Sequence, residues 1–318
     1  MPNSLSRLCL AALVLAALHC SSGTGPGGGG GGGGNSGLTA KIDGAAWEAD
    51  AISISAGAMA GIPGGLLILG SQTTGGVTRS INITLQNIRG TGTYALGVGP
   101  SVYGGIASEG EGSGGGGNAN VWLTPLDGVS GTVTITTLSG GRIVGTFEFT
   151  GDADNNNSVG GTRTITQGVF DLPFTGTIAP VPANVGSAIS ATLNGVPYNA
   201  WDAFGALTVF TGGAGVDLNS TSSENAVSIT LVGVTAPGTY ALSNVSPEQF
   251  IIVGLNGGNA SNCCWGLNAG GDVGSVTVTS ITADRVQGTF SGTLQPHPGK
   301  PASLPLVITN GVFDVGIQ

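Results

Sequence analysis

Charged residues are scarce in this sequence, and most of them are acidic. Only 8% of the 318 residues are charged, and 8 Lys and Arg stand against 17 Asp and Glu, for a formal net charge of −9. A nucleic-acid partner needs a basic face that neutralises phosphates, so we expect no binding to nucleic acid. The same shortage disfavours attachment to an anionic membrane surface through a basic patch.

Histidine is almost missing as well, which argues against hydrolytic chemistry. The chain has 2 histidines. His297, the one outside the N-terminal leader, lies between two prolines, where a catalytic triad is difficult to assemble. The acidic residues Asp171 and Asp314 follow corresponding strands in different parts of the chain, so we do not expect a glycosidase pair. We predict that the protein is not an enzyme and uses no cofactor, with a hydrolase as the weaker alternative.

Beyond the leader, no apolar repeat of helical period extends over the length of a helix. The chain has instead 61 glycines and a hydrophobic share of 40%, together with many Thr, Ser, Asn and Val residues. This composition is typical of short strands separated by turns. Strand signals recur about every 8–15 residues. The sequence therefore predicts an all-β protein, either a sandwich or a barrel.

One stretch of the sequence occurs twice. Residues 81–96 read INITLQNIRGTGTYAL, and residues 227–242 read VSITLVGVTAPGTYAL. Each copy alternates apolar and polar residues, breaks at a turn and resumes with a Thr-Tyr strand, as paired antiparallel strands do. Further along, VTIT at 133–136 recurs as VTVT at 276–279, and the pairs in this part of the chain keep one offset of 143 residues. The sequence thus predicts one fold written twice.

We predict two tandem homologous antiparallel β domains, a first half at 38–177 and a second half at 187–318. A Pro-bearing linker at 178–186 joins them, because proline stiffens a joint and cannot enter a central strand. Each half opens with a turn pair, Asp43-Gly44 or Asn194-Gly195. Asp-Gly and Asn-Gly tolerate the positive φ angles of a tight hairpin.

The N-terminus has the features of an export signal. Residues 1–19 contain a basic residue and an apolar run, Leu8–Leu18, that is too short to span a bilayer. Cys20 follows where a lipoprotein has its acylated cysteine, although His19 departs from the usual preceding residue. We predict a lipoprotein signal peptide, a lipid on Cys20 and a flexible Gly-rich tether over 20–37. The alternative is an ordinary cleaved signal peptide with an unmodified Cys20.

The repeated motifs resemble those of a family of uncharacterised β-rich bacterial lipoproteins. The family pattern is a Thr-Ala-x-Asn/Asp-Gly-x-x-Trp opening, a Gly-Thr-Tyr-x-Leu centre, a Gly-Thr-Phe and a closing Ile-Thr-x-Gly-x-Phe-Asp. This chain has the opening at Thr39–Trp47 and, ending in Tyr, at Ala191–Tyr198. We expect Trp47 and Tyr198 to pack in the core, with a platform for a sugar ring as the alternative. The resemblance implies export and a lipid anchor in the envelope, at the outer membrane, and implies no activity.

Each half keeps one tryptophan inside a glycine-rich excursion between strands. Asn118 and Trp122 in the first half correspond to Asn259 and Trp265 in the second. Irregular loops with an embedded aromatic residue are where ligands often bind on a β scaffold. We therefore predict that these four residues take part in ligand binding.

Two further patterns leave alternatives open. Asp152, Asp154 and Asn156 have the spacing of a calcium loop, but the twelfth position is not acidic, so we favour a polar hairpin tip and expect no metal. Cys263 and Cys264 form either a strained vicinal disulfide or two thiols.

The favoured function is binding or display of a glycan or protein ligand by a lipid-anchored envelope protein, without catalysis. Its partners would be the membrane, reached through the N-terminal lipid, and the ligand bound by the loops. The alternative is a purely structural envelope spacer, for which no saturable ligand exists.

Overall fold

The computed structural model shows a chain built from β-strands. The structure describes residues 37–318 except 114–119, 126, 156, 211–212, 243–248, 256–264, 267–270, 299–301 and 303. Residues 37–318 form one compact unit. The only helical segment among the described residues is the 3₁₀ turn η1 (Ala51–Ser53), and none of their helices is long and apolar enough to cross a membrane. The predicted all-β class is confirmed.

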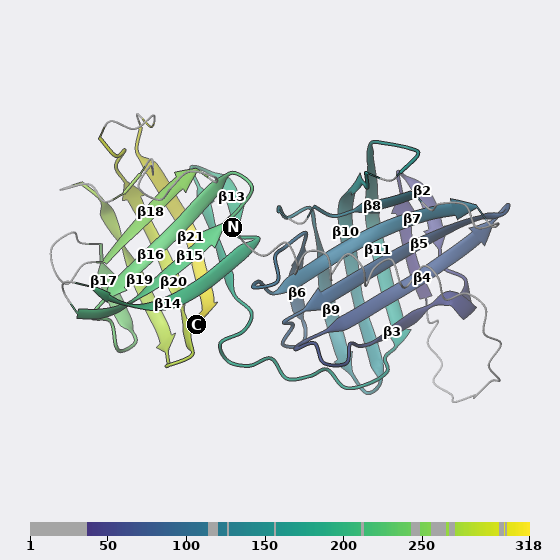
Figure 1. Cartoon of the computed structure of the whole chain (residues 1–318), viewed down its shortest axis with the longest axis horizontal. Coiled ribbons are helices and arrows are strands. Elements are labelled where there is room, and N and C mark those ends of the chain that lie inside the picture. The colour runs from purple at the N-terminus through teal and green to yellow at the C-terminus, as the bar shows by residue number, and fades with distance from the viewer. Residues whose placement is uncertain are drawn as a thin grey trace. The chain divides into compact units, whose positions relative to one another are not determined.

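The strands of the first half join in one sheet (Figure 1). Their order is β2-β1-β11-β10-β9-β6-β7-β5-β4-β3, and β8 pairs with β10 and β7 beside this path. The pairing of β6 with β7 is parallel, through Ala95–Gly104 and Leu96–Gly105. The strands are β1 (Gly37–Ile42), β2 (Ala45–Glu48), β3 (Ser55–Ala58), β4 (Leu66–Thr74), β5 (Val77–Gln86), β6 (Gly92–Leu96), β7 (Gly104–Ser113), β8 (Asn120–Leu123), β9 (Gly131–Ser139), β10 (Arg142–Ala153) and β11 (Thr162–Pro173).

The second half has the same strand order divided between two sheets. One sheet runs β13-β12-β21-β20-β19-β17 and the other β14-β15-β16-β18. Within the described residues, β17 and β18 do not pair, whereas their counterparts β6 and β7 do. The strands are β12 (Ala188–Leu193), β13 (Val196–Asn199), β14 (Asp202–Phe210), β15 (Gly213–Thr221), β16 (Asn225–Val232), β17 (Gly238–Ala241), β18 (Gln249–Leu255), β19 (Val273–Ile281), β20 (Arg285–Leu294) and β21 (Leu306–Gly316).

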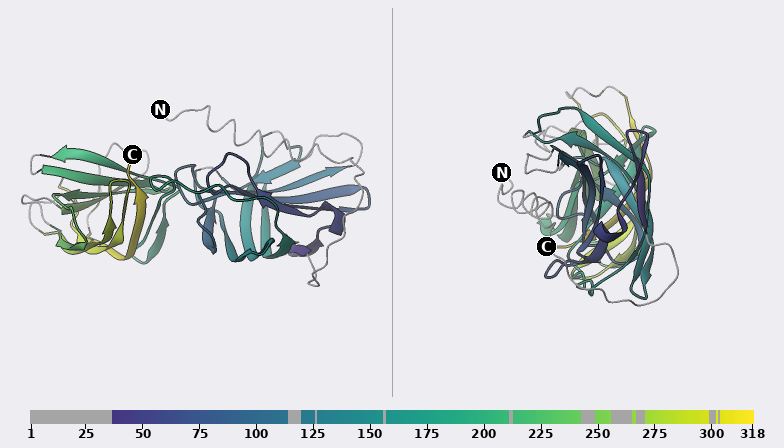
Figure 2. Two further views of the ribbon diagram at one scale, coloured as in Figure 1. Left: turned by 90° about the horizontal axis from the view of Figure 1, so that it is seen from below. Right: turned by 90° about the vertical axis from the view of Figure 1, so that its right-hand side faces the viewer.

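The strands of each half lie in two layers (Figure 2), so each half is sandwich-like. Buried apolar side chains gather into two clusters, one built mainly from each half. Trp47 and Tyr198 belong to these clusters and are each 3% exposed, which places both in the core. The shared strand order is what a duplicated unit would show. The common origin of the two halves itself stays a prediction.

Both expected hairpin turns are present. Asp43 and Gly44 have φ angles of 49° and 83°, and Asn194 and Gly195 have 48° and 84°. Two consecutive positive φ angles in a two-residue loop are the mark of a type I′ turn, whose twist matches that of the strands it joins. The turns connect β1 to β2 and β12 to β13.

The Gly-Thr-Phe and Gly-x-Phe motifs pack through reciprocal contacts between strands. Gly145 of β10 lies opposite Phe170 of β11, and Phe147 lies opposite Gly168. A Cβ atom added to Gly145 would lie 2.4 Å from the Phe170 ring and 2.1 Å from the carbonyl oxygen of Thr134. Only glycine fits there, because each ring lies over the backbone of the neighbouring strand.

The second half contains the same arrangement between β20 and β21. Gly288 lies opposite Phe313, and Phe290 opposite Gly311. The two rings have centroids 6.4 Å apart, against 6.3 Å for the rings of the first half. These repeated motifs therefore specify the packing and register of two strands, and they belong to the scaffold rather than to a binding site.

We predict that Gly145→Ala destabilises the protein by about 2 kcal/mol, because the added methyl group overpacks a filled core. Urea unfolding followed by tryptophan fluorescence measures the loss. Gly160→Ala is the matched control, since a Cβ at Gly160 meets nothing within 4 Å. Equal stability of the two variants would show that the ring contact does not constrain this position.

Candidate functional site

Trp122 and Trp265 occupy corresponding places in the two halves. Trp122 lies in β8 and pairs with Glu109 of β7 on one side and with β10 on the other. Trp265 bridges Val253 of β18 and Pro296, which follows β20. Each tryptophan thus closes the same end of its half between two equivalent strands.

In the first half this end is closed by charged residues. Trp122 is 1% exposed, and the Cζ atom of Arg163 lies 4.1 Å from the centre of its ring. Arg163 forms ion pairs of 2.8 Å with Asp43 and 3.1 Å with Glu111. The indole is therefore covered by a guanidinium, and Trp122 is not the open loop residue that the sequence suggested.

Glu109 lies beneath this guanidinium and is fully buried. Its nearest charged contact is the Nε atom of Arg163 at 3.7 Å, and neither carboxylate oxygen has a hydrogen-bond partner among the described residues. Burial raises the pKa of Glu109 to about 7. Arg163 and Arg79 oppose the rise, while the carboxylates of Glu111 and Asp43 add to it. Glu109 consequently titrates near neutral pH.

The second half places neutral residues at the corresponding positions. Arg163 pairs with Gly151 of β10, and at the equivalent place in the second half Leu306 pairs with Leu294 of β20. Leu306 therefore corresponds to Arg163. Val253 replaces Glu109 beside the tryptophan. The residues that covered the indole in the first half are therefore absent from these positions in the second.

The hairpin turns confirm that the two ends correspond. The Oδ1 atom of Asp43 accepts a 2.9 Å hydrogen bond from the backbone N–H of Thr164. The Oδ1 atom of Asn194 accepts a 2.8 Å bond from the N–H of Val307. Asp43 and Asn194 thus make the same contact in their respective halves, but only Asp43 carries a charge.

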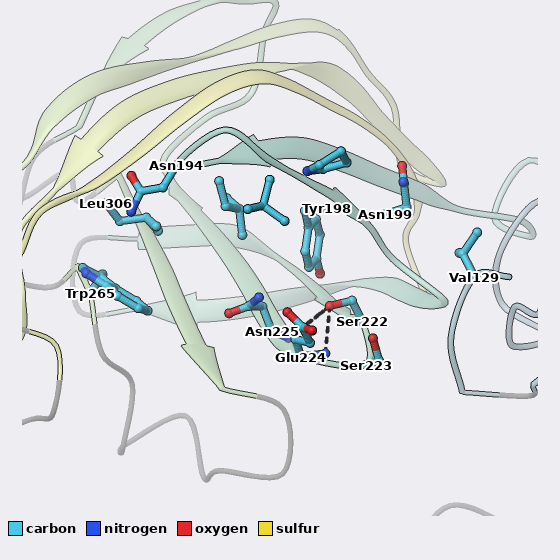
Figure 3. A pocket seen from close by; sticks show the side chains of 13 residues that line it. Val129, Asn194, Tyr198, Asn199, Ser222, Ser223, Glu224, Asn225, Trp265 and Leu306 are labelled. Atoms are coloured by element: carbon cyan, nitrogen blue, oxygen red, sulfur yellow. Dashed lines mark hydrogen bonds between the residues drawn. The ribbon is translucent and has the colours of Figure 1, made fainter.

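At the end of the second half the structure has a groove of about 430 Å³ beside Trp265 (Figure 3). The indole Nε1–H donates a 2.9 Å hydrogen bond to the carbonyl oxygen of Leu304, which fixes the ring's orientation. The groove combines two aromatic side chains and several apolar ones with amide and hydroxyl groups and a single carboxylate. Its lining includes Trp265, Tyr198, Leu306, Asn194, Asn199, Asn225, Ser222, Ser223 and Glu224.

The polar wall of the groove is held by a turn before β16. The hydroxyl oxygen of Ser222 accepts hydrogen bonds from the backbone N–H groups of Asn225, at 3.0 Å, and Glu224, at 3.4 Å. Asn225 stands at the position of Arg79 in the first half. Arg79 lies two residues before Ile81, which pairs with Glu109. Asn225 lies two residues before Val227, which pairs with Val253. Small amides and hydroxyls in this wall suit a neutral polar ligand.

Several predicted site residues lie outside the described residues: Cys20, Asn118, Asn156, Asn259, Cys263 and Cys264. Asp152 and Asp154 are exposed near the end of β10. In the part of the chain that the structure describes, no group of three His, Cys, Asp or Glu residues is arranged to hold a metal ion.

The strand-end acids Asp171 and Asp314 form ion pairs with Arg142 and Arg285 on the neighbouring strands. Each pair joins the two closing strands of its half, β10 with β11 and β20 with β21. These carboxylates are thus engaged in corresponding structural contacts.

Sequence reasoning missed the charged cluster of the first half. Glu109 and Glu111 are two residues apart on β7, and Arg79 is two residues before the apolar Ile81 of β5, so all three side chains point to the inward face. Charged residues at inward positions of a strand were the available signal. The position of Arg163 over Trp122 depends on pairing between distant strands.

Residues 34–172 match a family described as a domain of unknown function, DUF6252. The match extends over nearly all of the first half, from β1 into the last residues of β11. No curated protein and no solved structure matches the chain. The expected resemblance to a family without an assigned activity is thus supported for this part of the chain.

We predict that Glu109→Gln makes the protein more stable than the native chain at pH 8, with a smaller difference at pH 5. Folding raises the pKa of Glu109 from 4.5 to about 7. The native chain therefore loses stability as the pH rises from 4.5 through 7, because the buried carboxyl group has to ionise. The difference in the free energy of unfolding between Glu109→Gln and the native chain should change by about 2 kcal/mol between pH 5 and pH 8.

Urea unfolding of both proteins at each pH measures this change. Glu148→Gln, at an exposed position of β10, is the matched control for replacing a carboxyl group by an amide. A constant difference between native protein and Glu109→Gln across this range would contradict the buried, shifted carboxyl.

Proposed function

We propose that this protein is a non-catalytic, lipid-anchored protein of the bacterial envelope that binds a glycan in the groove beside Trp265. The observation that carries the proposal is the composition of that groove. An indole face is combined with a tyrosine, three asparagines, two serines, one carboxylate and five apolar residues in a cavity of about 430 Å³.

This chemistry suits a sugar more than other ligands. Pyranose rings have apolar faces that pack on aromatic rings, and their hydroxyls bond to amides and carboxylates. A volume of about 430 Å³ falls in the range of small-molecule sites and suits one or two sugar units. A nucleotide or other polyanion is disfavoured, since the lining residues include Glu224 and no Lys or Arg.

The first half does not offer a second copy of this site. Arg163 lies over the indole of Trp122, so that aromatic face is occupied. We therefore expect one ligand per chain, although both halves contain the tryptophan.

The lipid anchor is supported by the leader, which places Cys20 after an apolar run and before the glycine-rich stretch. A tether of this kind holds a binding domain away from the membrane while limiting its diffusion to the envelope surface. A protein that only separates envelope layers would need no groove with such a lining.

We predict that Trp265→Ala lowers glycan affinity at least tenfold, because the stacking face of the groove is lost. A glycan array identifies the ligand and isothermal titration measures affinity and stoichiometry. Phe204→Ala is the control, since Phe204 is an exposed aromatic residue of β14 outside the groove. Unchanged affinity in Trp265→Ala would remove the groove as the site, and the absence of any saturable glycan would favour the spacer.

We further predict that mass spectrometry of the mature N-terminus detects acyl groups on Cys20. Cys20→Ser should release the protein from the membrane fraction, because the lipid is the expected anchor. An unmodified cysteine at the N-terminus, or membrane retention of Cys20→Ser, would contradict the anchor without bearing on the groove.

A further inference from the structure

We propose that the end of the first half is a cation-binding site for guanidinium or alkylammonium groups, and that Arg163 of this chain is its resident occupant. The site consists of the face of Trp122 and the carboxylates of Asp43, Glu109 and Glu111. This inference is independent of the ligand proposed for the second half.

The floor of the site is aromatic. The Cζ atom of Arg163 lies 4.1 Å from the centre of the Trp122 ring, well inside the distance at which the negative face of an indole attracts a cation. The ring is held in place from both sides by the pairing of β8 with β7 and β10. A buried indole with one face toward a cation is a rigid and specific surface.

The walls of the site are carboxylates from two parts of the fold. Asp43 comes from the β1–β2 turn and contacts the guanidinium at 2.8 Å, while Glu111 of β7 contacts it at 3.1 Å. Glu111 also pairs with Arg79 at 2.9 Å. Without Arg163, Arg79 would be the only arginine left beside these three carboxylates, and its ion pair is with Glu111.

Glu109 provides the independent indication of a cation. Its carboxylate is fully buried and has no hydrogen-bond partner among the described residues. A buried carboxylate without hydrogen bonds is costly to ionise unless a cation lies close by. The Nε atom of Arg163, at 3.7 Å, is close enough to supply that charge.

The second half shows that the scaffold does not require these charges. Leu306, Val253 and Asn194 stand at the positions of Arg163, Glu109 and Asp43. Leu255 stands at the position of Glu111, so the arginine and the three carboxylates are all replaced at an end with the same strand order. This joint replacement is expected if the carboxylates serve the cation.

The experiment is chemical rescue of Arg163→Ala in the full-length protein. The variant should melt several degrees below the native chain, and millimolar methylguanidinium should restore at least half of that loss by binding the folded state. Methylurea, which has a similar shape and no charge, should not. The native protein should show no specific response to methylguanidinium, since its site is filled.

Two further variants separate binding from a general effect of the additive. Arg163→Ala combined with Glu109→Gln should lose most of the rescue. Arg142→Ala is the control, because it removes an ion-paired arginine of β10 that has no aromatic contact among the described residues. Equal responses of Arg142→Ala and Arg163→Ala, or equal effects of methylguanidinium and methylurea, would overturn the proposal.

If Arg163→Ala does not fold, refolding yield with and without methylguanidinium becomes the readout. Recovery with the cation supports the site, and equal yields overturn it. Methylammonium, tested in the same way, extends the assignment to alkylammonium groups if it also rescues and restricts the site to guanidinium groups if it does not.

Discussion

The contact between a phenylalanine ring and a glycine of the neighbouring strand is the constraint on which the rest of each half depends. A slip of one residue would turn every side chain of the closing strand to the opposite face, and the ring would then meet a side chain instead of a glycine. With the register fixed, the opening hairpin lies beside the start of the closing strand. Asp43 can then bond to Thr164 and Asn194 to Val307, which places one turn residue at the end of each half.

The two ends use this shared placement for different chemistry. In the first half Glu109 is buried and Arg163 is partly exposed, and the guanidinium offsets only part of the cost of ionising the buried carboxyl group. In the second half both charges are replaced by apolar residues, so that no ion has to be compensated. The consequence is a change in what covers the tryptophan. A guanidinium lies on Trp122, whereas Trp265 borders a groove lined with amides and hydroxyls.

Much of the scaffold could be predicted from the sequence because its signals are local. The Asp-Gly and Asn-Gly pairs specify positive φ angles within two residues, and alternation along a strand identifies its inward face. The site could not be predicted to the same extent. Trp122 follows a glycine-rich stretch, which suggested an open loop, but its pairing with β7 and β10 buries it. The position of Arg163 over that ring depends on strands far apart in sequence, and no local pattern specifies such pairing.

The distribution of charge supports the view that the end of the first half is specialised. The chain has 8 basic and 17 acidic residues, and five of these charges, two basic and three acidic, meet at one place. A protein that needs charges only for solubility spreads them over its surface, where water solvates each one. Concentrating them around a buried indole costs desolvation, which is recovered only through specific contacts between the charges. The second half has the same strand order without that cluster, so the strand order itself does not require the charges, and their concentration in the first half is explained by the contacts that they make.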